Sequence, residues 1–113
     1  MGRTLYEKIW AAHEVASGPG GRSLLNVDRH LIHDGSFHAF EALRNAGRKV
    51  RRPDLCLATP DHYVPTRNRG EHIADPMVRG KMEMLFENTG ATGIRHFAMD
   101  DPRQGIVHVV GPE

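Results

Sequence analysis

The sequence LCLATPDH at residues 55–62 is a short apolar run that stops at a proline and is followed by an acid and a histidine. The run Leu55–Thr59 predicts a small strand, because short apolar runs bounded by turn signals are typical of a sheet interior. Prolines on both sides of Asp61 and His62 stiffen the turn after this strand. A carboxylate beside an imidazole can hold the ring and raise its basicity, which suits proton transfer. Asp61 and His62 are therefore a candidate catalytic pair; the alternative is that Asp61 caps the turn and His62 is an exposed residue.

Helix signals lie on both sides of this strand. Before it, Ser36 is the expected N-cap of a helix that ends at Gly47, where a C-cap glycine belongs. After it, Asp75 is the expected cap of a longer helix, with Pro76 at its first position. The apolar side chains expected to face the core are Phe37, Phe40 and Leu43 in the first helix, and Val78, Met82, Leu85 and Phe86 in the second.

The N-terminal part predicts a helix followed by a strand. Thr4 and Glu7 form a capping box, which introduces an apolar stripe of Leu5, Ile9, Ala12 and Ala16. Residues 18–21, GPGG, cannot continue a helix and mark its end. A buried strand is expected to begin at Leu24–Val27 and to run on to His33. Two further strands are expected at residues 94–99 and 105–110.

Strands that alternate with helices indicate an α/β fold of two or three layers around a mostly parallel sheet. Ligands of such sheets gather at the carboxyl ends of the strands. His33, Asp61 and His62 fall at expected strand ends, and His108 lies in the last expected strand. This convergence favours a functional site at that edge of the sheet.

Composition excludes several classes of protein. The chain has 113 residues, enough for one domain or part of one. Lys and Arg total 15 against 14 Asp and Glu, so the net charge of +1 argues against a nucleic-acid-binding protein. No apolar stretch is long enough for a membrane span, and the N-terminus lacks the apolar core of a signal peptide. One cysteine rules out an internal disulfide and suggests a reducing compartment, so we expect a cytoplasmic protein.

The eight histidines invite a search for metal ligands and proton donors. The densest group is DRHLIHD at residues 28–34, but its spacing matches no four-ligand zinc signature. Residues three apart on a strand point to opposite faces, so His30 and His33 would not bind one ion together. We therefore expect no metal ligand in this chain, and we interpret His33 as a residue that reaches a substrate from the end of its strand.

The other residues of interest have simpler interpretations. The histidines expected to be surface or helix residues without a chemical role are His13, His38, His72 and His96. His108 lies in the apolar run 105–110, where a lone histidine is usually a hydrogen-bonded core residue. Cys56, between two leucines, is most simply a small core residue, because a single thiol cannot hold an iron–sulfur cluster.

Four segments of the sequence stand out together: TLYEKI at residues 4–9, VDRHLIH at 27–33, ATPDH at 58–62 and QGIVHVVGPE at 104–113. In the same order and at similar spacing, they resemble the large subunits of isopropylmalate isomerases (3-isopropylmalate dehydratases) of the aconitase superfamily. Each segment is moderately specific, but four of them in register are difficult to obtain by chance. The resemblance covers essentially all of the chain and implies that residues 1–113 form a partial aconitase-like α/β domain.

The resemblance also implies a reaction. These hydro-lyases dehydrate and rehydrate a hydroxy-carboxylate, interconverting 2-isopropylmalate and 3-isopropylmalate in leucine biosynthesis. A [4Fe–4S] cluster acts as the Lewis acid in the complete family enzyme. By resemblance, Asp61 and His62 match the family's Asp-His pair, which assists departure of the hydroxyl as water. His108 matches another catalytic histidine, and His33 stands where aconitases carry a substrate-binding glutamine.

The departures from the family limit what the chain can do. The family binds its cluster through three later cysteines, none of which is present, so we expect no cluster on this chain alone. The expected partners are the remainder of the large subunit, a small subunit with the swivelling domain that carries the catalytic base, and a small hydroxy-carboxylate substrate. The chain by itself is then inactive. Residues 33–36 and 61–66 also allow a maleate or methylmaleate hydratase, and a noncatalytic stand-alone binding module is a second alternative.

Overall fold

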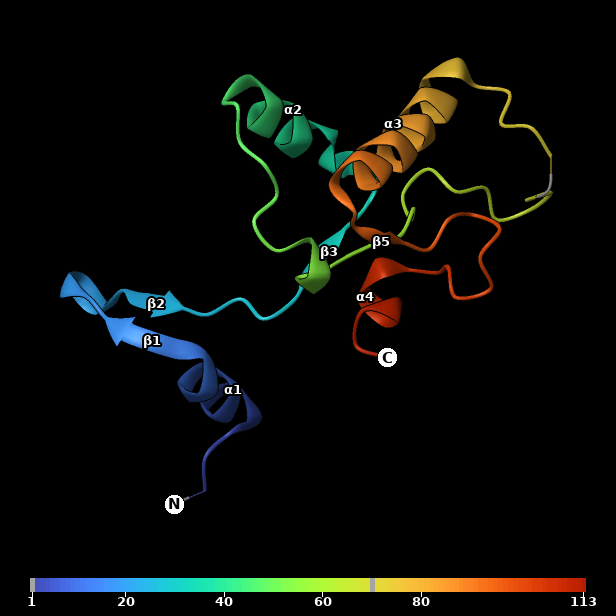
Figure 1. Ribbon diagram of the computed structural model, residues 1–113. Helices are drawn as coiled ribbons and strands as arrows, with labels where there is room; N and C mark the ends of the chain where they lie inside the picture. Colours follow the sequence, from blue (N-terminus) through green and yellow to red (C-terminus); the bar gives the residue numbers. More distant parts are fainter. Residues whose placement is uncertain (1, 70) are drawn as a thin grey trace.

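The structure is a computed structural model that describes residues 2–69 and 71–113 (Figure 1). The helices of the described residues are α1 (Leu5–His13), α2 (Phe37–Asn45), α3 (Pro76–Thr92) and α4 (Val107–Val110). The strands are β1 (Glu14–Ser17), β2 (Ser23–Leu25), β3 (His30–Ile32), β4 (Cys56–Ala58) and β5 (Arg95–His96). Short 3₁₀ turns lie at Pro19–Gly21, Asp34–Ser36 and Pro53–Leu55. None of the helices in these two ranges is long and apolar enough to cross a membrane.

A three-stranded parallel sheet organises the larger part of the chain. Its order is β3-β4-β5, and both pairings are parallel. Leu31 pairs with Leu57 and Ile32 with Ala58. Because side chains alternate along a strand, Ile32 and Ala58 point to one face of the sheet while Leu31 and Leu57 point to the other. The sheet confirms the α/β class that the sequence predicts.

Helices cover the two faces of this sheet unequally. Helices α2 and α3 lie on one side and the short α4 on the other (Figure 1). The core lies under α2 and α3, and its members are Ile32, Phe40, Ala58, Leu85 and Ile94. Cys56 packs against this cluster, as expected for a small core residue. On the opposite face, α4 ends so close to β3 that a Cβ added at Gly111 would overlap the Leu31 side chain.

The N-terminal segment forms a small unit of its own. Helix α1 leads directly into β1, which pairs antiparallel with β2, and Figure 1 shows this unit set apart from the parallel sheet. The prediction that the first helix includes Ala16 is wrong, because residues 14–17 leave the helix to form β1. Gly20 and Gly21 have φ of 71° and 72°, a region open to glycine, and they let the chain reverse toward β2.

The strand expected from residue 24 to residue 33 is also wrong. Its two halves are β2 and β3, which belong to different sheets. Leu24 and Val27, predicted to be buried, are 64% and 72% exposed. The antiparallel hairpin holds β2 beside β1, away from the core under α2 and α3, so this part of the run has no apolar layer to pack against.

Local capping follows the sequence at three predicted helix ends, whereas Ser36 occupies the N-cap position of α2 without a side-chain capping hydrogen bond. Thr4 and Glu7 cap α1 reciprocally through side-chain and backbone hydrogen bonds. Asp75 accepts hydrogen bonds from two backbone N–H groups in the first turn of α3. Gly47 has the left-handed φ of 62° expected after a helix. These predictions are confirmed because each depends on residues within a few positions of one another.

Three predictions for the C-terminal half are wrong. Phe86 is exposed, because α3 turns Leu85, Asn88 and Thr89 toward the core. The strand predicted at 94–99 is only the two-residue β5. Residues 105–110 contain helix α4 and no strand: the N–H groups of residues 109 and 110 donate to the carbonyl of residue 106. These local helical bonds occupy the donors that a strand ladder would need.

Candidate active site

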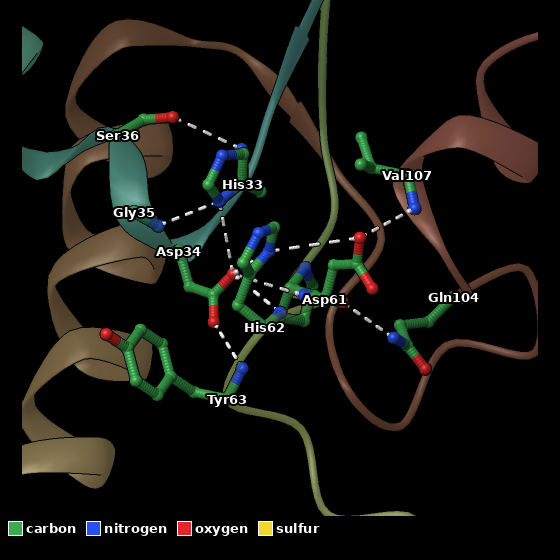
Figure 2. Close-up of polar contacts among 10 residues, drawn as sticks. His33, Asp34, Gly35, Ser36, Asp61, His62, Tyr63, Gln104 and Val107 are labelled. Carbon is green, nitrogen blue, oxygen red and sulfur yellow. Dashed lines mark hydrogen bonds and ion pairs between the residues drawn. The ribbon is translucent and has the colours of Figure 1, made fainter.

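Polar side chains gather where β3 and β4 end at the same edge of the parallel sheet (Figure 2). His33 and Asp34 directly follow β3, while Asp61 and His62 follow β4 after two intervening residues. The structure thus brings together three of the four residues singled out from the sequence, namely His33, Asp61 and His62. It adds Asp34, which the sequence analysis considered only within a rejected metal cluster.

Asp34 lies at the centre of the site, with 1% of its surface exposed. Its Oδ1 accepts hydrogen bonds from the backbone N–H groups of Asp61 (3.2 Å) and His62 (3.1 Å), and its Oδ2 accepts one from that of Tyr63 (2.7 Å). Burial acts to raise the pKa of Asp34, but the hydrogen bonds from His62, Asp61 and Tyr63 together outweigh it and hold the pKa below the ordinary 3.8. The buried carboxylate is therefore ionised at neutral pH.

The rings of His33 and His62 stack on one another, with centroids 4.2 Å apart and planes inclined by 15°. The Nδ1 of His33 accepts a hydrogen bond from the N–H of Gly35 (3.0 Å), so the neutral ring carries its proton on Nε2. In that state the 3.5 Å approach of His33 Nδ1 to Asp34 Oδ1 is no ion pair, because no proton lies between the two atoms. The backbone N–H of His33 donates to the hydroxyl of Ser36 (3.3 Å), which the sequence analysis assigned to capping α2.

His62 is the accessible member of the group. Its side chain is 55% exposed, compared with 35% for His33 and 15% for Asp61. Its Nδ1 lies 3.9 Å from Oδ2 of Asp61 and 3.9 Å from Oδ1 of Asp34. This distance is too long for a direct hydrogen bond, but it allows attraction between a protonated ring and the two carboxylates. Because both carboxylates lie on the Nδ1 side, Nε2 is the nitrogen that can face a ligand.

Two residues at the start of α4 hold the turn from its other side: Gln104, shortly before the helix, and Val107, its first residue (Figure 2). The N–H of Val107 donates to Oδ2 of Asp61 (3.2 Å), and the side-chain amide of Gln104 donates to the carbonyl of Pro60 (2.7 Å). Arg69 in turn donates to Gln104. Val107, 46 positions further along the chain, therefore orients the Asp61 carboxylate.

An open pocket of about 420 Å³ has His62 among its lining residues. Its lining combines apolar and charged side chains, among them Tyr63, Val64, Arg67, His72, Ile73 and Val78. A larger open groove of about 1080 Å³ lies on the α4 face of the sheet; Gln104 lines it, but His33, Asp34, Asp61 and His62 do not. The smaller pocket is the candidate for ligand binding, because His62 is among its lining residues.

His108 lies outside the stacked cluster. It is exposed on α4, so its interpretation as a core residue of a buried strand is wrong. Its neighbour Val107 contacts Asp61, which places His108 one residue from the site. A role for His108 in catalysis is still a prediction from resemblance.

The histidines expected to have no chemical role make local contacts. His13 pairs with Asp28 (3.2 Å), His38 packs beside Phe37, and the Nδ1 of His96 lies 3.2 Å from the hydroxyl of Thr89. His72 contacts Arg79 (2.7 Å), although it also lines the pocket beside His62. Burial lowers the pKa of His96 against the opposing effect of two nearby aspartates, Asp100 and Asp101.

His33, Asp34 and His62 also place possible metal-ligand atoms within 4.8 Å of one another, and no other such group was found among residues 2–69 and 71–113. His30 is not part of this group. The imidazole planes are nearly parallel, so their in-plane lone pairs do not converge on one point. His33 Nδ1 and both Asp34 oxygens already accept N–H bonds. This geometry favours a hydrogen-bonded cluster over a metal site.

Comparison with protein families agrees with this chemistry. The model of the aconitase family (aconitate hydratase) matches residues 7–113, almost the whole chain. The chain belongs to the aconitase family. Family membership implies an enzyme of the hydro-lyase kind, which removes and adds water. No solved structure matches the chain with statistical significance.

Aconitase-family enzymes generally use a [4Fe–4S] cluster, but the residues of this chain do not fit one. The sequence has a single cysteine, whereas such a cluster requires several thiolates. The Cys56 thiol donates to the carbonyl of Arg52 (3.3 Å), and burial, with a smaller effect of Asp54, raises its pKa. A neutral, half-buried thiol in a central strand is a packing group. The polar groups that this chain does supply at the candidate site are imidazoles, carboxylates and backbone N–H groups.

Two parts of the site, Asp34 and Gln104, were not predicted from the sequence. One signal was present: Asp34 is a charged residue immediately after an apolar strand and before a glycine, where a buried acceptor for a neighbouring loop can lie. Gln104 belongs to the matching segment 104–113, but nothing in its surroundings indicates the contact with Pro60. Both contacts join parts of the chain that only the folded sheet brings together.

Proposed function

We propose that this chain forms one wall of the active site of a hydro-lyase that interconverts 2-isopropylmalate and 3-isopropylmalate. In this proposal it acts as part of a complete large subunit that works with a small subunit. The observation that carries the proposal is the accessible His62 ring, stacked on His33 and flanked by Asp61 and Asp34 at the strand ends. Membership of the aconitase family and the four matching segments support it.

In the dehydration step, Nε2 of protonated His62 gives its proton to the substrate hydroxyl. The C–O bond breaks, its electron pair goes to oxygen, and water leaves. A base from the rest of the enzyme removes a proton from the neighbouring carbon, and the C–H electrons form the double bond. Asp61 and Asp34 both lie on the Nδ1 side of the ring, which leaves Nε2 to face the substrate. Rehydration reverses these steps with the hydroxyl on the adjacent carbon. A positioned acid of this kind contributes about 10²–10⁴-fold to the rate.

The surroundings of His62 suit a branched hydroxy-carboxylate. Arg67 in the adjoining pocket can bind a carboxylate, while Val64 and Ile73 offer an apolar wall for an alkyl group. His33 Nε2–H can donate a hydrogen bond to a substrate oxygen. The apolar wall favours an isopropyl-bearing substrate over maleate, which has no alkyl group to fill it. We assign His108 to the same site through the matching segment and its exposure on α4.

The test is the variant His62→Ala in the complete large subunit, paired with its small subunit. We expect kcat to fall by about 10²-fold or more, because the proton donor is lost. KM should change less, because Arg67 and the rest of the site still hold the substrate. Asp61→Asn should also lower kcat, because the ring loses one of its two flanking charges.

A matched control is His38→Ala, which removes an exposed histidine from α2, outside the cluster. It should leave kcat unchanged. If His62→Ala retained more than about a third of normal turnover, less than about 1 kcal/mol of barrier would be involved and the assignment would be wrong. Comparing kcat/KM for isopropylmalate with that for maleate would test the substrate.

A further inference from the structure

The backbone that carries Asp61 and His62 lies just beyond the end of strand pairing. The last contacts of β4 are the bond from the N–H of Thr59 to the carbonyl of Ile32 (3.0 Å) and the bond from the N–H of Phe97 to the carbonyl of Ala58 (2.9 Å). Pro60 then offers no N–H. The next three N–H groups, at residues 61–63, have no neighbouring strand to pair with. Backbone donors at a partly buried turn need an acceptor.

Asp34 supplies that acceptor for all three donors. Consecutive backbone N–H groups can form a concave cradle for an anion. Here the anion is the carboxylate of a residue two positions beyond β3, and its two oxygens accept at 2.7–3.2 Å. Hydrogen bonds to a charged acceptor are stronger than those between neutral groups. The ends of β3 and β4 are therefore joined by these hydrogen bonds as well as by the sheet. We call Asp34 and the N–H groups of residues 61–63 that it binds the clamp.

The clamp determines where the two side chains of the pair point. With the backbone of residues 61–63 held by Asp34, the Asp61 carboxylate reaches the N–H of Val107 and the His62 ring stacks on His33. The same Asp34 Oδ1 lies 3.9 Å from His62 Nδ1. Asp34 itself is 1% exposed and cannot reach a ligand in the pocket.

We propose that Asp34 is a positioning residue for the dehydration step, an inference that rests on the proposed function. It acts through His62 in two ways: it fixes the backbone that carries the ring, and it places a second negative charge near the Nδ1 of the protonated ring.

The variant Asp34→Asn tests this role in the complete enzyme. The amide has the shape of the carboxylate, but its NH₂ group cannot accept an N–H, so at least one of the three bonds is lost together with the charge. We expect kcat to fall by about 10²-fold, the effect of a misplacement of about 1 Å, with a much smaller change in KM. Amide hydrogen exchange of residues 61–63, followed in the complete protein, should become faster. In a His62→Ala background, Asp34→Asn should lower kcat little further, because the two residues act as one unit.

The matched control is Asp28→Asn, the same substitution at an aspartate whose side chain is 70% exposed. It should change neither kcat nor exchange at residues 61–63. Circular dichroism verifies that each variant is folded. Should Asp34→Asn not fold, Asp34→Glu keeps both oxygens but displaces them by one methylene, and it allows the same comparison with His62→Ala.

Two results would overturn the positioning role. One is unchanged amide exchange at residues 61–63 in Asp34→Asn, and the other is an equal loss of kcat with and without the His62 imidazole. The two proposals also fail differently. Full activity of His62→Ala refutes the proposed function, whereas a slow His62→Ala enzyme with a fully active Asp34→Asn enzyme overturns the positioning role alone.

Discussion

Replacing Asp34 by alanine should lower the free energy of unfolding of the chain by about 3 kcal/mol. The variant removes the acceptor of three backbone N–H groups. A typical intramolecular hydrogen bond contributes a net stabilisation of about 1 kcal/mol, and a buried donor left unpaired costs about 1–3 kcal/mol. His62 is exposed and its N–H can turn to water, whereas Asp61 and Tyr63 are half-buried. A loss of this size is large, because single domains are stable by only about 5–15 kcal/mol.

The measurement is urea unfolding followed by circular dichroism, with Asp28→Ala as the matched control at an exposed aspartate. The control should leave the urea midpoint nearly unchanged, because substitutions at exposed positions have small effects on stability. Where the wild-type chain is stable by less than the predicted loss, Asp34→Ala should be unfolded without denaturant. A loss below about 1 kcal/mol would show that water replaces the carboxylate easily, and would refute the reasoning from buried donors.

The pH dependence provides a second test of the same clamp. The folded-state pKa of Asp34 lies below its ordinary value of 3.8, so its stabilisation is fully present well above pH 3.8. It is lost as the pH falls through the lower folded-state pKa. The difference in unfolding free energy between wild type and Asp34→Ala should therefore be constant from neutral pH to about pH 5 and shrink on further acidification. If the difference in unfolding free energy between wild type and Asp34→Ala grew on acidification, a lowered pKa of Asp34 in the folded state would be contradicted.

Three other outcomes are expected. Gly35→Ala should shift the NMR signals of the His33 ring, because the added Cβ would lie 2.6 Å from its Cε1; Gly80→Ala, whose Cβ meets nothing within 4 Å, should not. Anaerobic incubation of the chain with iron and sulfide should leave the monomer without a brown cluster, because one thiol is present; stoichiometric cluster on a monomer would contradict this. The isolated chain should bind apolar dyes or self-associate, because Leu5 and Ile9 of α1 are 72% and 52% exposed. A monomer that binds no dye and unfolds in a sharp, high-temperature transition would show that this surface does not promote association.

Prediction from the sequence succeeded where structure depends on near neighbours. The caps at Thr4 and Asp75 and the glycine at Gly47 use hydrogen bonds or dihedral angles within a few residues. The parallel sheet followed from the alternation of apolar runs with helices. Prediction failed at residues 105–110, where a continuous apolar run indicated a strand. There the chain packs as a helix against β3, and tertiary contacts outweigh a weak intrinsic preference.

For the candidate site, the chemistry of Asp61 and His62 and their place after a strand could be derived from eight consecutive residues, 55–62. The hydrogen bonds that gather residues 61–63 around Asp34 could not be derived in this way. Its oxygens bind N–H groups 27 to 29 residues further along the chain. That distance is bridged by the parallel register of β3 and β4, which leaves no periodic pattern in the sequence. A buried carboxylate is stable only when donors surround it, and where those donors lie is a property of the folded sheet.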